Sequence, residues 1–406
     1  MLPPPLRNRD FRRFYTGSML STFGTQFTTV AMAWQMYELT NSPLQVGLIG
    51  LTRAVPQIAL AVFGGMLADV LDRRRLLISV QLISFVVSAS LAALTFMGRM
   101  SPQLLLSASV LFALTSALET PSRQAVVPNI VPREDLSSAM ALFNTQRGVA
   151  MIAGPSLAGV TLGFTGPAVC YCIDAISWFA MVTGVALIRK PLQVSSAKPS
   201  LEAILAGARF VVSQQVILSF MILDFGATFF GSVNALLPIY ARDILAVGPV
   251  GLGVLYAAIS VGAVVTGIAM SLFRIERAGK WVLIGVAIYG VCTMGFAASH
   301  LLWLSVLMLA GTGAGNAVSA VLRQTSNQML TPDNLRGRVS AFNSIFTQGG
   351  PQLGQFESGL VADLGGAPLS GVTGGLGCCL LVAGIALLPR VRSFSLTHEK
   401  RAAAIA

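Results

Sequence analysis

Five charged side chains interrupt otherwise apolar stretches of the sequence, and they are its clearest candidates for chemistry. They are Arg53, Arg147, Asp174, Asp224 and Glu357. Burying a charge in lipid is costly, so such residues are usually functional or paired. Burial also favours the neutral form of a carboxylate, which lets it bind and release a proton near neutral pH. Each of these three carboxylates is therefore either a proton-binding group or half of a structural ion pair.

Other reactive side chains are not grouped as an enzyme would require. The two histidines, His300 and His398, are far apart and form no triad or metal cluster. We interpret the five cysteines, which fall inside apolar stretches, as small buried residues. A phosphate-binding Gly-Lys-Ser/Thr pattern is also missing, which argues against an ATP-driven pump. We expect no enzyme activity, no cofactor and no bound metal.

The elements that must position these charges are membrane helices. Of the 406 residues, 54% are apolar and only 11% are charged, whereas soluble domains are roughly one-quarter charged. A helix that crosses a bilayer core of about 30 Å needs about 20 residues. We predict an all-α membrane protein with twelve such helices, the first of them an uncleaved span, at residues 15–37, 44–67, 76–98, 102–121, 138–163, 167–188, 216–240, 249–272, 280–298, 301–324, 339–362 and 367–388.

The positive charges predict how the chain is oriented. The net charge is +11, and 23 of the 27 Lys and Arg fall at the termini and in alternate loops, Arg123 and Arg323 among them. The opposite loops hold only Arg99 and Arg242. Positive residues are retained on the cytoplasmic side during insertion. We therefore expect both termini in the cytoplasm, and the charge gives no reason to expect a nucleic-acid partner.

The sequence repeats itself once. Arg123-Gln124 and Pro132 recur as Arg323-Gln324 and Pro332 at an offset of 200 residues, and Phe143-Asn144 recurs as Phe342-Asn343 at 199. Two pseudo-symmetric six-helix bundles are a common plan for secondary transporters. We predict bundles at 1–188 and 216–390, a cytoplasmic linker at 189–215 and a tail at 391–406. Within the linker we expect an amphipathic helix after Ser200, with a plain solvated linker as the alternative.

The segment between the second and third predicted helices carries a recognisable motif. Gly65, Ala68, Asp69, Arg73 and Arg74 match the signature of the major facilitator superfamily, whereas Val70 and Asp72 depart from it. The chain thus resembles this superfamily. The resemblance implies that Gly65, Asp69, Arg73 and Arg74 lock the cytoplasmic gate of the outward-facing state. The alternative is a cluster that only sets topology.

A second motif lies in the fifth predicted helix. Gly154-Pro155-Ser156-Leu157-Ala158-Gly159 is similar to the Gly-Pro-x-x-Gly-Gly motif of drug/proton antiporters, with Ala158 in place of a glycine. Gly350-Pro351 echoes it in the eleventh. Proline removes a helix hydrogen bond and bends the helix. We predict a hinge at Gly154, Pro155, Gly159, Gly350 and Pro351, with ordinary close packing as the alternative.

The superfamily's architecture implies which helices surround the cavity, namely the first, fourth, seventh and tenth. On that basis Asp224 is the first candidate for proton coupling. Glu357 is the second, unless it pairs with Arg53. Candidates for substrate contact, each of which packing alone would also explain, are Gln26, Trp34, Phe229, Asn234 and Asn316.

Further segments resemble the branch that holds bacterial siderophore exporters and drug-efflux proteins, among them Val46-Gly47-Leu48 and Gly253–Ala258. The resemblance implies a monomeric secondary active transporter of the bacterial inner membrane. It is expected to export a siderophore or an amphipathic drug-like molecule in exchange for protons, by alternating access. The alternatives are an importer or uniporter of a small nutrient, and a transport-inactive membrane sensor.

Overall fold

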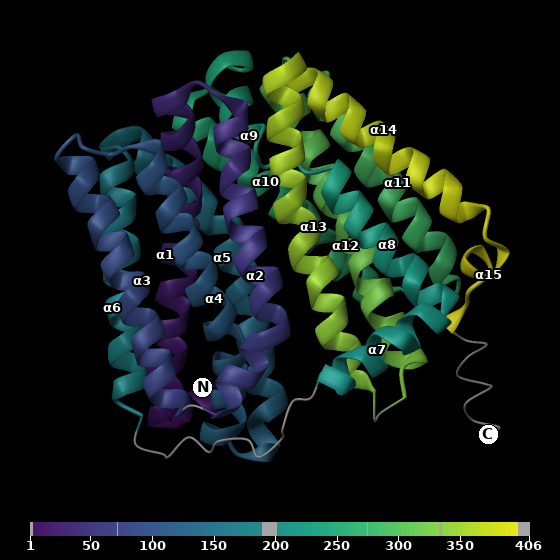
Figure 1. The fold of residues 1–406 in the computed structure, drawn as a ribbon, viewed down its shortest axis with the longest axis horizontal. Coiled ribbons are helices and arrows are strands. Elements are labelled where there is room, and N and C mark those ends of the chain that lie inside the picture. The colour runs from purple at the N-terminus through teal and green to yellow at the C-terminus, as the bar shows by residue number, and fades with distance from the viewer. Residues whose placement is uncertain (1–2, 71, 189–200, 274, 333–334, 397–406) are drawn as a thin grey trace. The chain divides into compact units, whose positions relative to one another are not determined.

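The computed structural model describes residues 3–70, 72–188, 201–273, 275–332 and 335–396, and it leaves the side chains of residues 61–70, 125, 201–206 and 341 undescribed. All regular elements in this part of the chain are helices (Figure 1). Three are short 3₁₀ or π-helical segments, η1 (Pro4–Arg7), η2 (Arg133–Asp135) and η3 (Tyr240–Ile244). The α-helices are α1 (Arg9–Thr40), α2 (Pro43–Val70), α3 (Arg73–Phe96), α4 (Pro102–Ile130), α5 (Leu136–Thr165), α6 (Pro167–Ala186), α7 (Leu201–Ser213), α8 (Gln215–Phe230), α9 (Leu237–Ile239), α10 (Gly248–Leu272), α11 (Ala278–Ala297), α12 (Leu302–Leu330), α13 (Arg336–Gly365), α14 (Ala367–Ala386) and α15 (Pro389–Arg392).

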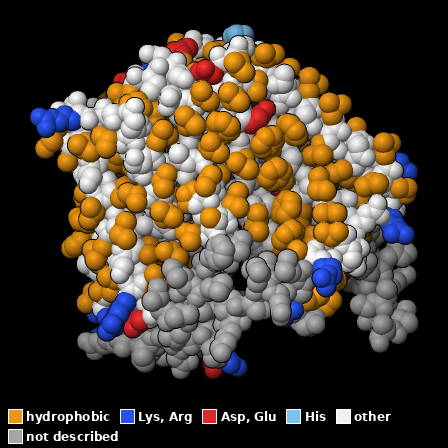
Figure 2. Space-filling view, in the orientation of Figure 1, with side chains coloured by type: hydrophobic (Ala, Val, Ile, Leu, Met, Phe, Trp, Pro, Cys, Tyr) orange, Lys and Arg blue, Asp and Glu red, His pale blue; other side chains and the backbone are white. Residues whose placement is uncertain are grey.

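Twelve of the described helices have 16 residues or more, one for each predicted span. Among the described residues, eight helices are long and apolar enough to cross a membrane, or nine if the sharply bent pair 207–213 and 215–230 counts as one span, fewer than the twelve predicted. Figure 2 shows hydrophobic side chains over most of the visible face, with Lys and Arg near its edges. This surface suits a lipid environment.

Two helices run past the ends predicted for them. We expected spans ending at 121 and 324, but α4 continues to Ile130 and α12 to Leu330. Hydropathy falls where polar residues begin, yet polar residues can continue a helix whose backbone is already hydrogen-bonded. The assignment of Arg123 to a loop was therefore wrong, because it lies within α4. Arg323 was counted with the loop charges although the predicted span 301–324 already contains it, and it lies within α12.

The seventh predicted span, 216–240, is interrupted. Helix α8 ends at Phe230, and the chain turns before α9 and η3. Non-helical backbone at membrane depth needs hydrogen-bond partners from the protein. The Tyr289 hydroxyl donates to the carbonyl of Gly231 at 2.8 Å, and the Ser358 hydroxyl donates to that of Ser232 at 2.6 Å.

The contacts divide the chain into two compact units. Unit 1 comprises Met1–Asn41, Thr52–Pro199 and Val247–Ala257, and unit 2 comprises Ser42–Leu51, Ser200–Ala246 and Ala258–Ala406. In unit 1, α1 packs on α5 and α6, and α3 packs on α4 and α6 (Figure 1). In unit 2, α11 packs on α12 and α14, and α8 packs on α13 and α14. The bundle boundaries drawn from the sequence remain a prediction.

The internal repeat is visible in the helix boundaries. Helices α4, α5 and α6 start and end 200 residues before α12, α13 and α14. The turns between the last two helices of each set place Gly166 and Gly366 at φ of 80° and 88°, a conformation that favours glycine. One side-chain contact repeats as well. Cys170 Sγ lies 3.8 Å from the Ala158 carbonyl, and the Ser370 hydroxyl donates to the Ser358 carbonyl at 2.8 Å.

The predicted amphipathic helix corresponds to α7, whose N-terminal half has no described side chains, and Ser200 lies outside the described residues. The described half packs on α13. Gly207 lies against Arg338, and Val211 is buried with Met221 and Val339. Helix α7 is thus anchored to unit 2 by its apolar side.

Candidate functional site

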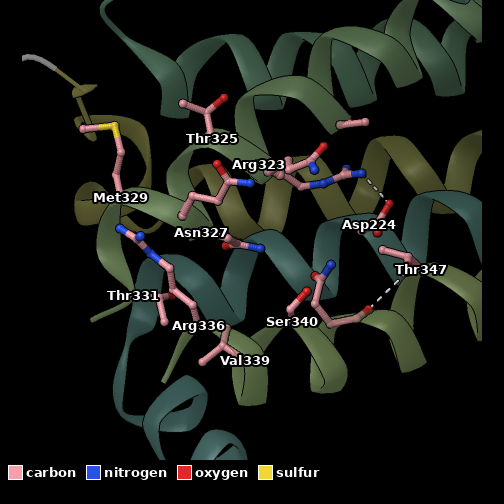
Figure 3. A pocket seen from close by; sticks show the side chains of 14 residues that line it. Asp224, Arg323, Thr325, Asn327, Met329, Thr331, Arg336, Val339, Ser340 and Thr347 are labelled. Carbon is pink, nitrogen blue, oxygen red and sulfur yellow. Dashed lines mark hydrogen bonds and ion pairs between the residues drawn. The ribbon is translucent and has the colours of Figure 1, made fainter. Parts of the chain in front are cut away.

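A buried ion pair joins α8 to α12 in unit 2. Asp224 Oδ1 accepts a hydrogen bond from Arg323 Nη2 (Figure 3). The two residues are only 5% and 7% exposed. Arg323 Nη1 also donates to the Ser319 hydroxyl, one turn earlier in α12, at 2.5 Å. Charges this deeply buried persist only when they are paired, so each depends on the other.

This ion pair lies at the edge of a polar hollow of about 810 Å³. Its lining comes mainly from the second half of α12 and the first half of α13 (Figure 3). Amide and hydroxyl side chains dominate, and the described lining contains no aromatic ring. Asn327 Oδ1 and Thr331 Oγ1 are buried without a hydrogen-bond partner among the described residues. Buried polar atoms of this kind are ready to bind water or a polar ligand. The other polar residues of the lining include Gln324, Thr325, Gln328, Arg336, Ser340, Asn343 and Thr347.

A smaller hollow of about 150 Å³ lies at the break after α8. Asn234 and Asn316, two of the predicted substrate contacts, both line it, together with Tyr289 of α11. A third predicted contact, Phe229, stacks on Phe225 with ring centroids 5.7 Å apart. The structure thus brings the two asparagines together and places Phe229 in an aromatic contact.

Unit 1 contains a carboxylate held by three helices. Asp174 of α6 is 1% exposed, and its Oδ2 accepts hydrogen bonds from Thr28 of α1 and Ser88 of α3, both at 2.7 Å. No described cation forms an ion pair with it, so the hydroxyl groups supply its polar contacts. This arrangement ties α1, α3 and α6 together.

The other predicted sites of unit 1 have different surroundings. Arg53 of α2 points Nη2 at Met32 Sδ, 3.6 Å away, and interacts electrostatically with Tyr256 of α10. Arg147 of α5 is exposed. Gln26 of α1 lies against Gly154 of α5, and Trp34 is half-buried in the same helix as Gln26.

A second arginine–carboxylate pair lies in unit 1. Arg123 Nε lies 2.9 Å from Glu119 Oε1, one turn earlier in α4. Arg123 Nη2 also donates to the hydroxyl of Ser21 in α1. Gln81 of α3 is fully buried and faces Glu119. The sequence analysis assigned Arg123 to a loop and did not single out Glu119, so it missed this cluster.

Glu357 of α13 is half-buried, next to the break in the seventh span. Its Oε2 lies 3.5 Å from the hydroxyl of Ser358, which donates to the Ser232 carbonyl at the break. Glu357 belongs to unit 2 and Arg53 to unit 1. Their pairing remains a prediction, as does a role for Glu357 in proton coupling.

Part of the predicted gating motif lies outside the described side chains, namely Gly65 and Asp69. Arg74 Nη2 donates to the carbonyl of Ala186 at the end of α6. Asp72, which departs from the superfamily pattern, caps α3, because its Oδ1 accepts from the backbone N–H of Arg74 at 2.9 Å and of Arg75 at 3.2 Å. The departure has a structural reason, since aspartate is a favourable helix N-cap.

The hinge glycines mark close backbone contacts. A Cβ on Gly159 of α5 would lie 2.7 Å from Gly253 Cα of α10, and one on Gly359 of α13 would lie 2.7 Å from Gly47 Cα of α2. The two contacts are related by the repeat. Gly350 faces Thr228, and Pro351 lines the smaller hollow. That Gly154, Pro155, Gly159, Gly350 and Pro351 act as hinges remains a prediction.

Comparison with known proteins decides the family. The model of the transmembrane secretion effector family matches residues 3–404. The chain belongs to this family of major facilitator superfamily transporters. It is therefore a multi-pass membrane transporter and not an enzyme, as the sequence predicted.

Its relatives include two named transporters. The enterobactin exporter EntS of Salmonella typhi is 27% identical over 342 residues, which cover 81% of this chain and 80% of the exporter. The staphyloferrin A transporter of Staphylococcus aureus is 28% identical over 171 residues, covering 40% of this chain and 43% of that protein.

The fold is also shared with solved structures. The crystal structure of a bacterial homologue of the human lysosomal transporter Spinster matches with a TM-score of 0.78 at 14% identity, covering 96% of this chain and 98% of that chain. This likeness concerns the fold, and it confirms the predicted all-α membrane fold of the superfamily.

Sequence reasoning found Asp224 but missed its partner. Arg323, Ser319 and most of the polar lining lie in the second half of α12 and the start of α13. One signal was available, because the Arg-Gln pair recurs after 200 residues in both halves. An arginine that recurs in both repeats, in a helix that continues past its apolar stretch, indicates that a buried carboxylate pairs with it.

Proposed function

We propose that the chain is a proton-coupled exporter that moves a siderophore or an amphipathic drug-like molecule out of the bacterial cytoplasm by alternating access. It works as a monomer in the inner membrane, with both termini in the cytoplasm. Two relatives named as siderophore transporters support the cargo class, and the excess of positive loops supports the orientation.

The observation that carries this proposal is the Asp224–Arg323 pair beside the polar hollow. Cargo from the cytoplasm binds the amides and hydroxyls of the hollow while Asp224 is ionised and paired with Arg323. A proton that reaches Asp224 from the outer side removes its attraction for the arginine, and the resulting movement of α8 against α12 releases the cargo outward. Release of the proton to the cytoplasm restores the ion pair and the cargo-binding state.

Three further features fit this cycle. The paired glycines of α5–α10 and α2–α13 allow helices to approach at backbone distance, which suits contacts that must open and close. The break after α8 supplies backbone groups and two asparagines to the smaller hollow. The Gly65–Arg74 segment serves as the cytoplasmic lock.

Uptake by inside-out membrane vesicles tests the proposal. Enterobactin and an amphipathic dye serve as probes, with and without a protonophore. We expect uptake of at least one probe that collapses when the proton gradient is removed. Equal uptake with and without the protonophore would reject proton coupling in favour of a uniporter. Absence of transport for every probe, from a correctly folded protein, would favour the sensor.

Asp224→Asn identifies the coupling carboxylate. The variant should lose gradient-driven uptake and keep cargo binding, because asparagine retains a hydrogen-bond acceptor near Arg323 but cannot titrate. Asp243→Asn, which removes a half-exposed carboxylate in η3, is the matched control and should transport normally. Full activity in Asp224→Asn would transfer the coupling role to Glu357.

A further inference from the structure

Two arginines related by the internal repeat each contact one carboxylate and one hydroxyl, but the two partners swap positions between the repeats. Arg123 of α4 and Arg323 of α12 are 200 residues apart, in helices whose boundaries show the same offset. Each guanidinium bonds one side chain four residues earlier in its own helix and one side chain from a neighbouring helix. One partner is a carboxylate and the other a hydroxyl in both cases, but their positions are interchanged.

In unit 1 the carboxylate lies on the arginine's own helix. Glu119 and Arg123 are four residues apart in α4, with 2.9 Å between Oε1 and Nε. The link to α1 is the neutral hydroxyl of Ser21. An ion pair within one helix places no restraint between helices. Protonation of Glu119 would therefore leave the hydrogen bond between α1 and α4 in place.

In unit 2 the carboxylate lies on the neighbouring helix. Asp224 of α8 pairs with Arg323 of α12, and the partner within α12 is the hydroxyl of Ser319. The attraction between two opposite charges adds to the hydrogen bond between them, and it is stronger in a buried environment than in water. Neutralising Asp224 therefore weakens the side-chain link between α8 and α12 itself.

We infer that residues 119 and 319 determine which arginine responds to a proton. Ser319 is a positioning residue, because its lack of charge leaves Asp224 as the carboxylate that Arg323 must use. Proton binding then loosens α8 from α12. In unit 1 Glu119 pairs with Arg123 within α4, and the α1–α4 contact is left to the neutral hydroxyl of Ser21. The proton response of these two arginine sites is thereby confined to unit 2, next to the polar hollow. Asp174, the other buried carboxylate of unit 1, bonds α1 and α3 and not α4. The inference rests on the proposed proton coupling.

The surroundings of the two pairs are consistent with this assignment. Of the described ionisable groups, Arg323 of α12 and Tyr289 of α11 interact with Asp224, and Arg336 of α13 lines the same hollow. Cys378 of α14 interacts with Tyr289. Arginine, tyrosine and cysteine ordinarily keep their charge state between about pH 5.5 and 7.5. Glu119 faces Arg123 and Gln81, and Gln146 of α5 contacts α1 at Ser18 and Thr22.

Spin-label distances in the full-length protein test the inference. A pair of nitroxides at the exposed positions Ile222 and Val321 reports on α8 and α12, and a pair at Leu20 and Leu114 reports on α1 and α4. The labels are introduced into a chain whose five cysteines are replaced by alanine, after its transport has been checked. We expect the α8–α12 distance distribution to change between about pH 7.5 and 5.5, and the α1–α4 distribution to stay constant.

Moving the carboxylate provides the decisive variants. Asp224→Ser with Ser319→Glu copies the pattern of unit 1 into unit 2. It should keep Arg323 paired, keep the fold and lose the pH response of the α8–α12 distance. Ser21→Asp with Glu119→Ser makes the reverse change, and it should give the α1–α4 distance a pH response. Ser319→Ala also lacks a charge at this position, so it should keep the pH response, and loss of the response would show that the hydroxyl and not the missing charge matters. Ser271→Ala, which removes an exposed hydroxyl bonded to Ile268 in its own helix, is the control.

Two results would overturn the inference. One is an α8–α12 distance in the parent that does not change with pH. The other is a pH response retained in Asp224→Ser/Ser319→Glu. Should this variant misfold, the Ser21→Asp/Glu119→Ser variant decides by gaining a response or not. The distances are measured without cargo, so failure of the vesicle experiment would reject the proposed function and leave this test separate.

Discussion

Asp224 and Arg323 compensate each other's charge at a depth where either one alone would be expensive. Arg323 is held on one side by Asp224 and on the other by Ser319. Removing one member of a buried pair strands the other without compensation. Both the stability of the fold and the proposed proton coupling therefore depend on these two side chains. Different variants are needed to measure the two effects separately.

Arg323→Met should destabilise the protein by about 3–5 kcal/mol, because it leaves Asp224 buried without a cation. Thermal unfolding in detergent measures the effect. Asp224→Asn combined with Arg323→Gln should recover most of the loss, since neither charge remains. Arg147→Gln changes an exposed arginine and should leave the unfolding temperature unchanged. A midpoint for Arg323→Met equal to that of the parent would show that the pair is not needed for stability.

The partner of Asp224 could not be read from the sequence, because 99 residues separate the two members of the pair. Hydropathy also misled the assignment, since it marks where apolar residues stop and not where α12 stops. The carboxylate itself was predictable as a charge within an apolar stretch. The two asparagines were predictable as polar residues of cavity helices. Their meeting in one hollow depends on the break after α8, which a few turn-forming residues such as Gly231 and Asn234 produce without lowering the average hydropathy.

At the scale of elements, helix ends and helix contacts explain several motif residues. Asp72 satisfies two backbone N–H groups at the start of α3. Gly159 and Gly359 permit backbone contact with α10 and α2. A motif residue can therefore be required by a cap or a contact before any role in gating is considered.

Replacing Asp72 separates capping from charge. Asp72→Ala should cost about 0.5–2 kcal/mol in the first turn of α3, whereas glycine, the superfamily's usual residue, should cost only a few tenths. Amide hydrogen exchange at Arg74 and Arg75 reads this directly, since both amides donate to Asp72. Asp72→Asn is the control that keeps the cap and removes the charge. Equal protection in Asp72→Ala and the parent would show that the cap has no effect.

Gly359→Ala tests the contact between α13 and α2. The added methyl group would lie 2.7 Å from Gly47 Cα, and we expect a loss of about 1–3 kcal/mol from overpacking. Gly267→Ala is the matched control, because a Cβ there meets nothing within 4 Å. In that helix interior alanine should stabilise by roughly 0.5–1 kcal/mol. Opposite signs in the two unfolding temperatures are expected, and equal shifts would count against a close contact.

At the scale of the whole molecule, the existence of the long helices followed from apolar stretches of about 20 residues, which a bilayer requires, although only eight or nine of the described helices are long and apolar enough to meet that requirement. The repeat followed from matched residues, and it reappears in the shared boundaries of α4–α6 and α12–α14. The division into two contact units could not be predicted from the sequence. Residues 42–51 of the first half belong to unit 2, and residues 247–257 of the second half belong to unit 1. Such exchanges depend on glycine contacts in space, which no linear pattern specifies.

Reporter fusions test the predicted orientation. Green fluorescent protein attached after Ala406 should be bright, and alkaline phosphatase at the same point should be inactive, because the positive-inside rule retains this end in the cytoplasm. Phosphatase inserted at the turn after α3, at Gly98, should be active. An active phosphatase after Ala406 would reverse the orientation and, with it, the direction of transport.

The contact between the start of α2 and α13 has a consequence for biosynthesis. The Ser42 hydroxyl donates to Asp363 Oδ1, 321 residues later in the chain, at 2.9 Å. Ribosomes add about 5–20 residues per second, so the start of α2 waits roughly a quarter of a minute to a minute in the membrane before its partner exists. During that interval Gly47 and its neighbours face lipid or other components of the insertion machinery. The first half of the protein can reach its final packing only when the last helices have been made.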